Sequence, residues 1–249
     1  MKLPSYFHAR PVRVLLAGCG GTGSHALSGL ARLHTCLRAV DHPGLEVTAA
    51  DPDRVSEANV GRQLFAASDL GHPKADVLVH RLNLWYDLAW QARPEPVTAD
   101  FAPDRGADLL IGCVDSVAAR HALDACARAA RIPFWLDCGN DDRWGQVVLG
   151  QPVGTDRLPT VLEIFPDMRD AGDTGPSCSL AESLGRQGAF INQAIATLAL
   201  DALWTMFCSG RIDRFAWFLN LADGRMTSLD SDPATRARLT RSAGQDPAA

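Results

Sequence analysis

An apolar segment that runs directly into a glycine-rich turn and then into a helical pattern constrains the fold of this chain most strongly. Residues 13–17 (RVLLA) have the continuous hydrophobicity of a parallel strand that is buried on both faces. The turn at residues 18–23 (GCGGTG) follows at once, and residues 24–37 then place leucines on one helical face. Such a strand is stable only inside a sheet that helices cover, so the segment predicts a layered α/β fold.

Strand and helix patterns alternate through the first 150 residues. We expect strands at residues 13–17, 45–50, 97–101, 107–114, 132–137 and 145–150, and helices at residues 24–37, 74–88 and 116–130. This alternation predicts a Rossmann-like, mostly parallel sheet with helices on both faces.

The pattern changes in the second half of the chain. Residues 151–178 hold several prolines and little periodicity, which predicts a long crossover loop. We then expect an antiparallel C-terminal part made of an apolar helix at 189–207 and a hairpin of 214–221 with 226–229. The polar residues 231–249 predict a disordered tail, so residues 1–230 form a single predicted domain.

Composition excludes several classes of protein. The chain has 24 Lys+Arg against 29 Asp+Glu, a net charge of -5, which disfavours nucleic acid as the main partner. Its 7 cysteines form no C-x-x-C pair, so neither a disulfide framework nor a four-cysteine zinc site is expected. The N-terminus lacks the pattern of a signal peptide, and the longest apolar stretch is too short to span a bilayer comfortably. We therefore expect a cytoplasmic protein that does not enter a membrane.

The glycine turn has the spacing of a nucleotide-binding loop. Gly18, Gly20 and Gly23 match G-x-G-x-x-G between a strand and a helix, and Gly21 lies inside the motif. Glycines let main-chain N–H groups approach a phosphate, and the helix N-terminus adds a favourable potential. The motif suits a nicotinamide cofactor or ATP, and a tight turn without a ligand is the alternative. It is not a Walker loop, because no G-K-[ST] sequence follows.

The segment after the second strand carries a series of charged and amide side chains. Asp51 ends that strand, where a carboxylate commonly accepts hydrogen bonds from ribose hydroxyls, although a capping or turn role is the alternative. Asn59 and Arg62 follow, and Lys74 opens the next helix. A guanidinium and an ammonium suit a triphosphate and the departing pyrophosphate. Taken one at a time, both cations are equally well explained as solvated charges.

Asp115 directly follows the fourth predicted strand. A carboxylate at the carboxyl end of a central strand can hold Mg²⁺ on the phosphates of a nucleotide. The alternative is that Asp115 is the N-cap of the following helix.

Six stretches of the sequence carry a resemblance to a known superfamily. They are G-C-G-G-T-G-S (18–24), D-P-D-R-V-S-E-A-N-V-G-R-Q (51–63), G-H-P-K (71–74), C-V-D (113–115), I-P-F…G…G-Q-V (132–147) and S-C-S…Q-A-I (177–195). With these motifs the chain resembles the ThiF/MoeB/HesA superfamily of ubiquitin-activating-enzyme-like adenylating proteins, over about residues 12–208. The S-E-A-N-V-G-R-Q segment and the chain length are similar to those of the ThiF-related proteins of plasmid-borne PRTRC cassettes.

The resemblance implies an ATP-dependent reaction. A ubiquitin-like β-grasp protein presents its C-terminal glycine carboxylate to the α-phosphate, an acyl-adenylate forms and pyrophosphate leaves. The implied cofactors are ATP and Mg²⁺, and no zinc is expected. The implied nucleotide-binding residues are Gly18, Gly20, Gly21, Gly23, Asp51, Asp53, Asn59, Arg62, Gln63 and Lys74, with Gln63 orienting Arg62 and Asp115 beside the metal. The implied partners are a second copy of this chain and a conjugating or JAB-type protein.

The sequence departs from the family pattern, and one of its cysteines, Cys178, has two alternative roles. The family's R-Y-x-R-Q leader, whose arginine reaches a partner subunit's site, is missing, and only His8 and Arg10 lie nearby. The two structural C-x-x-C pairs of many members are also missing. Cys178 lies where some relatives form a thioester, and a helix N-terminus would favour its thiolate. A structural cysteine is the alternative.

Two other functions compete with adenylation. A nicotinamide-dependent oxidoreductase explains the glycine turn and Asp51, but gives no reason for Asn59, Arg62 and Lys74 in series. A non-catalytic nucleotide-binding scaffold in a plasmid-borne cassette would keep the fold and lose the chemistry.

Overall fold

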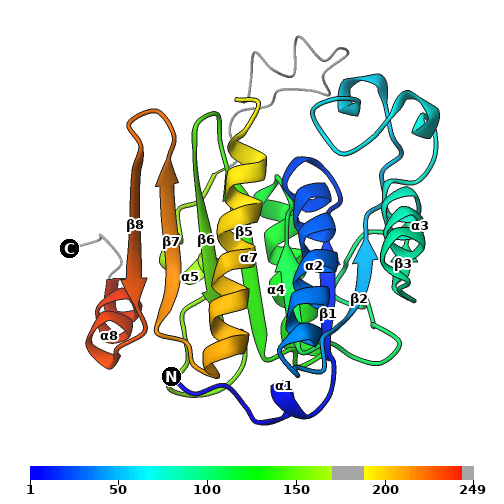
Figure 1. Cartoon of the computed structure of the whole chain (residues 1–249). Coiled ribbons are helices and arrows are strands. Elements are labelled where there is room, and N and C mark those ends of the chain that lie inside the picture. The colour runs from blue at the N-terminus through cyan, green and yellow to red at the C-terminus, as the bar shows by residue number, and fades with distance from the viewer. Residues whose placement is uncertain (170–187, 243–249) are drawn as a thin grey trace.

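A mixed β-sheet organises the part of the chain that the structure describes. The structure, a computed structural model, describes residues 1–169 and 188–242. In these residues eight strands form one sheet in the order β3-β2-β1-β4-β5-β6-β7-β8 (Figure 1). Their bounds are β1 Val12–Ala17, β2 Leu45–Ala50, β3 Gln91–Arg93, β4 Leu109–Gly112, β5 Phe134–Asn140, β6 Trp144–Gly150, β7 Arg214–Asn220 and β8 Arg225–Asp230.

The sheet is parallel on one side and antiparallel on the other. β1 pairs in parallel with β2 and β4, and the parallel part continues to β3 and β5. β6, β7 and β8 then extend the sheet by antiparallel pairing. The predicted Rossmann-like α/β fold with an antiparallel C-terminal part is confirmed.

Helices cover both faces of this sheet. α2 and α7 lie side by side on one face, and α4 and α5 lie on the other (Figure 1). The helices are α1 Tyr6–Ala9, α2 Gly21–Ala39, α3 Lys74–Tyr86, α4 Val117–Ala129, α5 Val161–Ile164, α7 Ile191–Ser209 and α8 Pro233–Ser242, with short 3₁₀ turns η1 Glu57–Asn59 and η2 Ala67–Asp69.

The contact between α2 and α7 joins the two halves of the chain. A Cβ on Gly29 of α2 would lie 2.0 Å from a methyl group of Leu200, so glycine lets the two helices approach this closely. Leu27 of α2 and Ile195 and Leu203 of α7 are fully buried. Among the described residues α7 is also the one helix long and apolar enough to cross a membrane, and half of it is buried, as in a core helix.

The third predicted strand, at residues 97–101, is wrong. The strand in this region is β3, Gln91–Arg93, at the edge of the sheet, and residues 97–101 form a loop. Only the last residue of this loop packs into the core: Phe101 is buried, and the Arg93 guanidinium lies 5.2 Å from its ring centroid. Pro96 precedes the loop and has no N–H to donate to a strand ladder.

The predicted disordered tail is wrong for residues 233–242, which form α8. Asp232 precedes the helix and accepts a hydrogen bond from the backbone N–H of Thr235 at 3.0 Å. Arg236 is buried and donates to the Asp156 side chain at 2.8 Å. A helix cap and an ion pair therefore order a segment whose polar composition indicated disorder.

A buried carboxylate ties the amino ends of β1 and β4 together. Asp108, just before β4, accepts hydrogen bonds from Arg10 at 2.6 and 2.8 Å and from Arg13 at 3.0 Å. Burial alone would raise the pKa of Asp108, but these hydrogen bonds outweigh it and lower the pKa to about 2. Arg10 is thus held within its own chain, at the end of the sheet opposite the glycine turn.

We expect Asp108→Asn to lower the free energy of unfolding at pH 7 by about 1–2 kcal/mol, because an amide replaces a carboxylate that two guanidiniums share. The pKa of this carboxyl is about 2 in the folded protein and about 4 in the unfolded chain. Its contribution is therefore complete above about pH 4 and is lost as the pH falls towards about 2. Urea denaturation at neutral and acidic pH measures the free energy of unfolding of both proteins. The difference between wild type and variant should be smaller at acidic pH.

The control for this prediction is Asp104→Asn. Asp104 forms an exposed ion pair with Arg93, so its loss should change stability by less than about 0.5 kcal/mol. Equal losses in the two variants would contradict the role assigned to Asp108.

Candidate nucleotide-binding site

A cavity of about 440 Å³ lies at the carboxyl ends of β1, β2, β4 and β5. The chain passes from β1 to β2 on one side, and β4 lies on the other side, so the cavity is at a topological switch point of the sheet. Open α/β sheets bind their ligands at such points. Nine of the predicted site residues line the cavity: Gly18, Gly20, Gly21, Asp51, Asp53, Arg62, Gln63, Lys74 and Asp115.

The glycine turn forms one wall of the cavity and leads directly into α2. Gly20 is the N-cap and Gly21 the first residue of α2, three residues earlier than the sequence predicts. The first turn of the helix, whose N–H groups have no partner within the helix, therefore borders the cavity. A Cβ on Gly20 would have only the Gln63 amide near it, at 3.9 Å, so it would occupy space that an approaching phosphate needs.

Two of the predicted glycines serve the turn itself. Gly18 has a φ of +91°, and a Cβ there would lie 2.5 Å from the carbonyl oxygen of Cys113. A Cβ on Gly23 would lie 1.8 Å from the carbonyl oxygen of Gly18, and Gly23 is not part of the cavity lining. The tight-turn explanation thus accounts for Gly18 and Gly23, whereas Gly20 leaves open space in front of the helix.

Asp51 fastens the glycine turn to the end of β2. One carboxylate oxygen accepts the backbone N–H of Cys19, and the other accepts that of Asp53 at 2.7 Å. Burial raises the pKa of Asp51, and these hydrogen bonds and the nearby Lys74 oppose the shift. A carboxylate has about four acceptor positions, so Asp51 retains the capacity to accept a ribose hydroxyl.

Two predicted phosphate-binding cations lie in the cavity wall. Lys74, the first residue of α3, is buried, and its ammonium donates to Asp53 at 2.8 Å. Arg62 is half-buried, and burial lowers the pKa of its guanidinium. Gln63 is buried beside it, and its Oε1 has no hydrogen-bond partner among the described residues. These side chains can meet a polyanion that replaces Asp53 as the partner of Lys74.

The structure does not bring Asn59 to the cavity. Its Oδ1 accepts hydrogen bonds from the backbone N–H of Ser56 at 3.0 Å and from the Ser56 hydroxyl at 3.1 Å, which caps η1. Its carbonyl oxygen accepts the N–H of Gln63 at 2.9 Å. Asn59 therefore shapes the turn that carries Arg62 and Gln63.

Asp115 lies at the end of β4 with its side chain exposed in the cavity. The N-cap of α4 is Ser116, whose hydroxyl accepts the N–H of Ala119 at 3.1 Å. The alternative reading of Asp115 as the helix cap is therefore wrong. Among the described residues there is no group of three or more side chains that could hold a metal alone. A single carboxylate still fits Mg²⁺, because that ion commonly takes its other ligands from phosphates and water.

Several residues of the site could not be found from the motifs. The Thr22 hydroxyl lies 2.8 Å from Asn140 Oδ1 and 2.9 Å from Asn192 Oδ1, which links α2, β5 and α7 at the cavity wall. The loop at residues 96–98, which the sequence assigned in part to a strand, forms another wall. Asn140 and Asn192 do carry a sequence signal, because each is a polar side chain at the end of an apolar strand or at the start of an apolar helix.

A buried ion pair behind the cavity was also missed. Arg120 of α4 donates to Asp137 of β5 at 3.1 and 3.3 Å, and both side chains are buried. Burial raises the pKa of Asp137 to about 6, although Arg120 opposes the shift. The next residue, Cys138, lines the cavity together with Cys113.

We expect Arg120→Leu to destabilise the protein by about 3 kcal/mol at pH 8 and by much less at pH 5, because it leaves a buried carboxyl without its counter-ion. Removing Arg120 raises the pKa of Asp137 further above 6. The pKa of Asp137 in the folded variant then lies above its value of about 4 in the unfolded chain. The variant is therefore most stable below about pH 4, and it loses stability as the pH rises through the pKa of Asp137 in the folded state. Denaturation at the two pH values measures this.

Arg128→Leu is the matched control, since Arg128 lies on the same helix, where it pairs with Asp124 and donates to the Pro152 carbonyl at 2.7 Å. Its effect should be equal at the two pH values, because Asp124, unlike Asp137, is partly exposed. A loss for Arg120→Leu that does not depend on pH would contradict the prediction.

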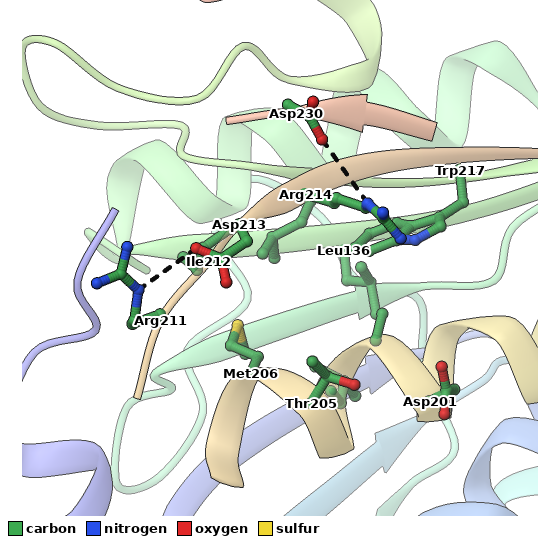
Figure 2. A pocket seen from close by; sticks show the side chains of 13 residues that line it. Leu136, Asp201, Thr205, Met206, Arg211, Ile212, Asp213, Arg214, Trp217 and Asp230 are labelled. Atoms are coloured by element: carbon green, nitrogen blue, oxygen red, sulfur yellow. Dashed lines mark hydrogen bonds and ion pairs between the residues drawn. The ribbon is translucent and has the colours of Figure 1, made fainter. Parts of the chain in front are cut away.

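A second cavity, of about 360 Å³, lies between α7 and β7 (Figure 2). Its floor is apolar and includes Leu136 and Met206. Its arginines are paired within the chain, Arg211 with Asp213 at 3.4 Å and Arg214 with Asp230 at 3.7 Å (Figure 2). It has neither the glycine turn nor a helix N-terminus in its lining, so the cavity at the switch point is the better phosphate site.

The proposed nucleophile Cys178 lies outside the described residues. The same holds for residues 170–178 of the predicted crossover loop. Residues 151–169 are described, and α5 interrupts them.

The fold and the cavity define a Rossmann-like α/β protein with a candidate nucleotide site at the switch point of its sheet. The chain matches the ThiF family over residues 4–237. It therefore belongs to the ThiF family. No curated protein gives a significant match to this sequence.

Similar solved structures include PaaA and two structures of MccB. They are PaaA (15% identity, TM-score 0.61), E. coli MccB with ATP (16%, 0.60) and the microcin C7 biosynthetic enzyme MccB in complex with N-formylated MccA (17%, 0.62). Each comparison covers 88% of this chain and 64% of the other chain, so this chain spans less than two thirds of their length. Identities this low establish the shared fold alone.

Proposed function

We propose that this protein is an ATP-dependent adenylyltransferase that activates the C-terminal glycine of a ubiquitin-like β-grasp protein. The observation that carries the proposal is one cavity lined by the glycine turn, Arg62, Lys74 and Asp115. Membership of the ThiF family supports adenylation in general. The ubiquitin-like substrate rests on the motif resemblance at residues 51–63.

Two similar structures support the choice of ligands. One is MccB with ATP, and another is MccB with the N-formylated peptide MccA. ATP and a polypeptide are therefore bound by proteins that share this fold, and we propose the same two ligand classes for this chain.

The residues of the cavity suit the proposed reaction. A carboxylate oxygen of the substrate attacks the α-phosphorus, and the bond to the bridging oxygen breaks, so pyrophosphate leaves with that electron pair. Arg62 and Lys74 would neutralise the charge that develops on the phosphates. Asp115 would hold Mg²⁺, which lowers the repulsion between the phosphates and the incoming carboxylate.

The assembly is part of the proposal. We propose a homodimer in the cytoplasm, within a PRTRC cassette, with a conjugating or JAB-type protein as a further partner. Arg10 already has a partner within its own chain, because its guanidinium pairs with Asp108 at 2.6 Å. The nicotinamide alternative is disfavoured by the two cations in the cavity, Arg62 and Lys74.

We expect the protein to exchange radiolabelled pyrophosphate into ATP only when a ubiquitin-like protein ending in glycine is present. Arg62→Ala and Asp115→Ala should each lower the exchange rate by about 10²–10³-fold, because each removes a charge that acts on the phosphates. Arg211→Ala, at an exposed ion pair in the second cavity, should leave the rate unchanged. ATP binding without exchange would favour a non-catalytic scaffold, and tighter binding of a nicotinamide nucleotide would favour the oxidoreductase.

We propose that activation is followed by transfer of the acyl group from the adenylate to the Cys178 sulfur, which releases AMP. An adduct with the substrate protein should then form with ATP and disappear on thiol treatment. Cys178→Ala should abolish the adduct, whereas Cys208→Ala, at an exposed thiol on α7, should retain it. An adduct that survives in Cys178→Ala, observed by non-reducing electrophoresis, would contradict this assignment.

A further inference from the structure

Two cysteines lie on neighbouring strands in the wall of the nucleotide cavity. Gly112 at the end of β4 pairs in register with Asp137 of β5, and Cys113 and Cys138 are the residues that follow them. Both cysteines line the cavity. Neighbouring strands lie about 4.8 Å apart, within the range of about 4.4–6.8 Å that separates the Cα atoms of a disulfide. The backbone therefore places these two residues where a disulfide can form.

The two side chains point to the same face of the sheet. Ile111 pairs with Leu136, and Cys113 and Cys138 each lie two residues further along, so all four side chains share one face. A hydrogen bond joins the Cys113 and Cys138 side chains. Helix α2 covers this face, since a Cβ on Gly23 would lie 3.3 Å from the Cβ of Cys113. The two sulfur atoms are thus already in contact.

The two thiols differ in their access to solvent. Cys113 is half-buried in the cavity wall, whereas Cys138 is 2% exposed. The hydrogen bond with Cys113 and burial raise the pKa of Cys138 well above the usual value of a thiol. Cys113 is therefore the thiol that meets a small oxidant in the cavity, and Cys138 is held beside it as the second reactant.

Cys113 is also packed against the glycine turn. A Cβ on Gly18 would lie 2.5 Å from the carbonyl oxygen of Cys113, and the Cys113 N–H donates to Ala17, directly before the turn, at 2.8 Å. A disulfide requires its sulfur atoms to approach to about 2.05 Å, so Cys113 must shift towards β5 when the bond forms. The glycine turn has no free space against Cys113 and must move with it.

We propose that Cys113 and Cys138 form an oxidative modification site, at which hydrogen peroxide joins the two sulfur atoms and thereby weakens nucleotide binding. The Cys113 sulfur attacks one peroxide oxygen, the O–O bond breaks and water leaves, so a sulfenic acid remains. The Cys138 sulfur then displaces the sulfenic oxygen as a second water. The two thiols lose two electrons and two protons, and the peroxide is reduced to two waters. A dithiol reductant reverses the reaction.

Peptide mapping of the full chain tests the pairing. Trypsin places Cys113 in the peptide 106–120 and Cys138 in the peptide 132–143, and each peptide holds no other cysteine. After peroxide treatment, thiol blocking and digestion without reductant, we expect these two peptides to be linked. Dithiothreitol should separate them. Linkage of Cys113 to Cys19 instead, or oxidation of Cys113 to a sulfinic acid without any linkage, would overturn the pairing.

Titration calorimetry with ATP and Mg²⁺ tests the consequence. The dissociation constant of the wild type should rise about tenfold after peroxide treatment, or about 1.4 kcal/mol, and dithiothreitol should restore it. In Cys113→Ala and in Cys138→Ala the treated and untreated proteins should bind ATP equally, whatever the affinity of the untreated variant. The control Cys208→Ala, at an exposed thiol of α7, should keep the tenfold change. A tenfold change in either cavity variant would overturn the proposal.

This inference goes beyond the proposed function, because it requires a nucleotide in the cavity but no adenylation. Linked peptides without a change in ATP affinity would overturn the control of nucleotide binding and leave the adenylation proposal standing. An ATP affinity that responds to peroxide as expected, in a protein that exchanges no pyrophosphate, would uphold the modification site and overturn adenylation.

Discussion

The nucleotide cavity depends on the buried carboxylate of Asp51. Its two oxygens accept the backbone N–H groups of Cys19 and Asp53, so it holds the glycine turn and the segment after β2 in one arrangement. Asp53 in turn pairs with Lys74, which places the ammonium at the same cavity. One carboxylate thus sets the relative positions of a helix N-terminus and a buried cation, the two features that can attract a phosphate.

Most of the sheet could be predicted because its central strands are buried on both faces and therefore read as continuous apolar segments. The prediction of a strand at residues 45–50 is confirmed by β2, and the hairpin by β7 and β8. The edge strand β3 has only three residues, which is too short for a periodic pattern. The helix α8 depends on Arg236 meeting Asp156, 80 residues away, and local composition carries no information about such a contact.

The residues of the candidate site show the same difference between local patterns, which the sequence reveals, and long-range contacts, which it does not. The structure brings Arg62, Lys74 and Asp115 to one cavity, as the motifs predict, and Lys74 and Asp115 begin or follow elements that the pattern locates well. Asn59 was expected at the phosphates, but its side chain is used in a local turn, as short amide side chains often are. The contact of Thr22 with Asn140 and Asn192 joins residues more than 100 positions apart, so only the packed structure reveals it.

The second half of the chain completes the site that the first half begins. A Cβ on Gly21 would lie 2.7 Å from the Asn192 amide, so the start of α7 packs directly on the first turn of α2. A mutation that shifts α7 would therefore move the wall of the nucleotide cavity as well as the core.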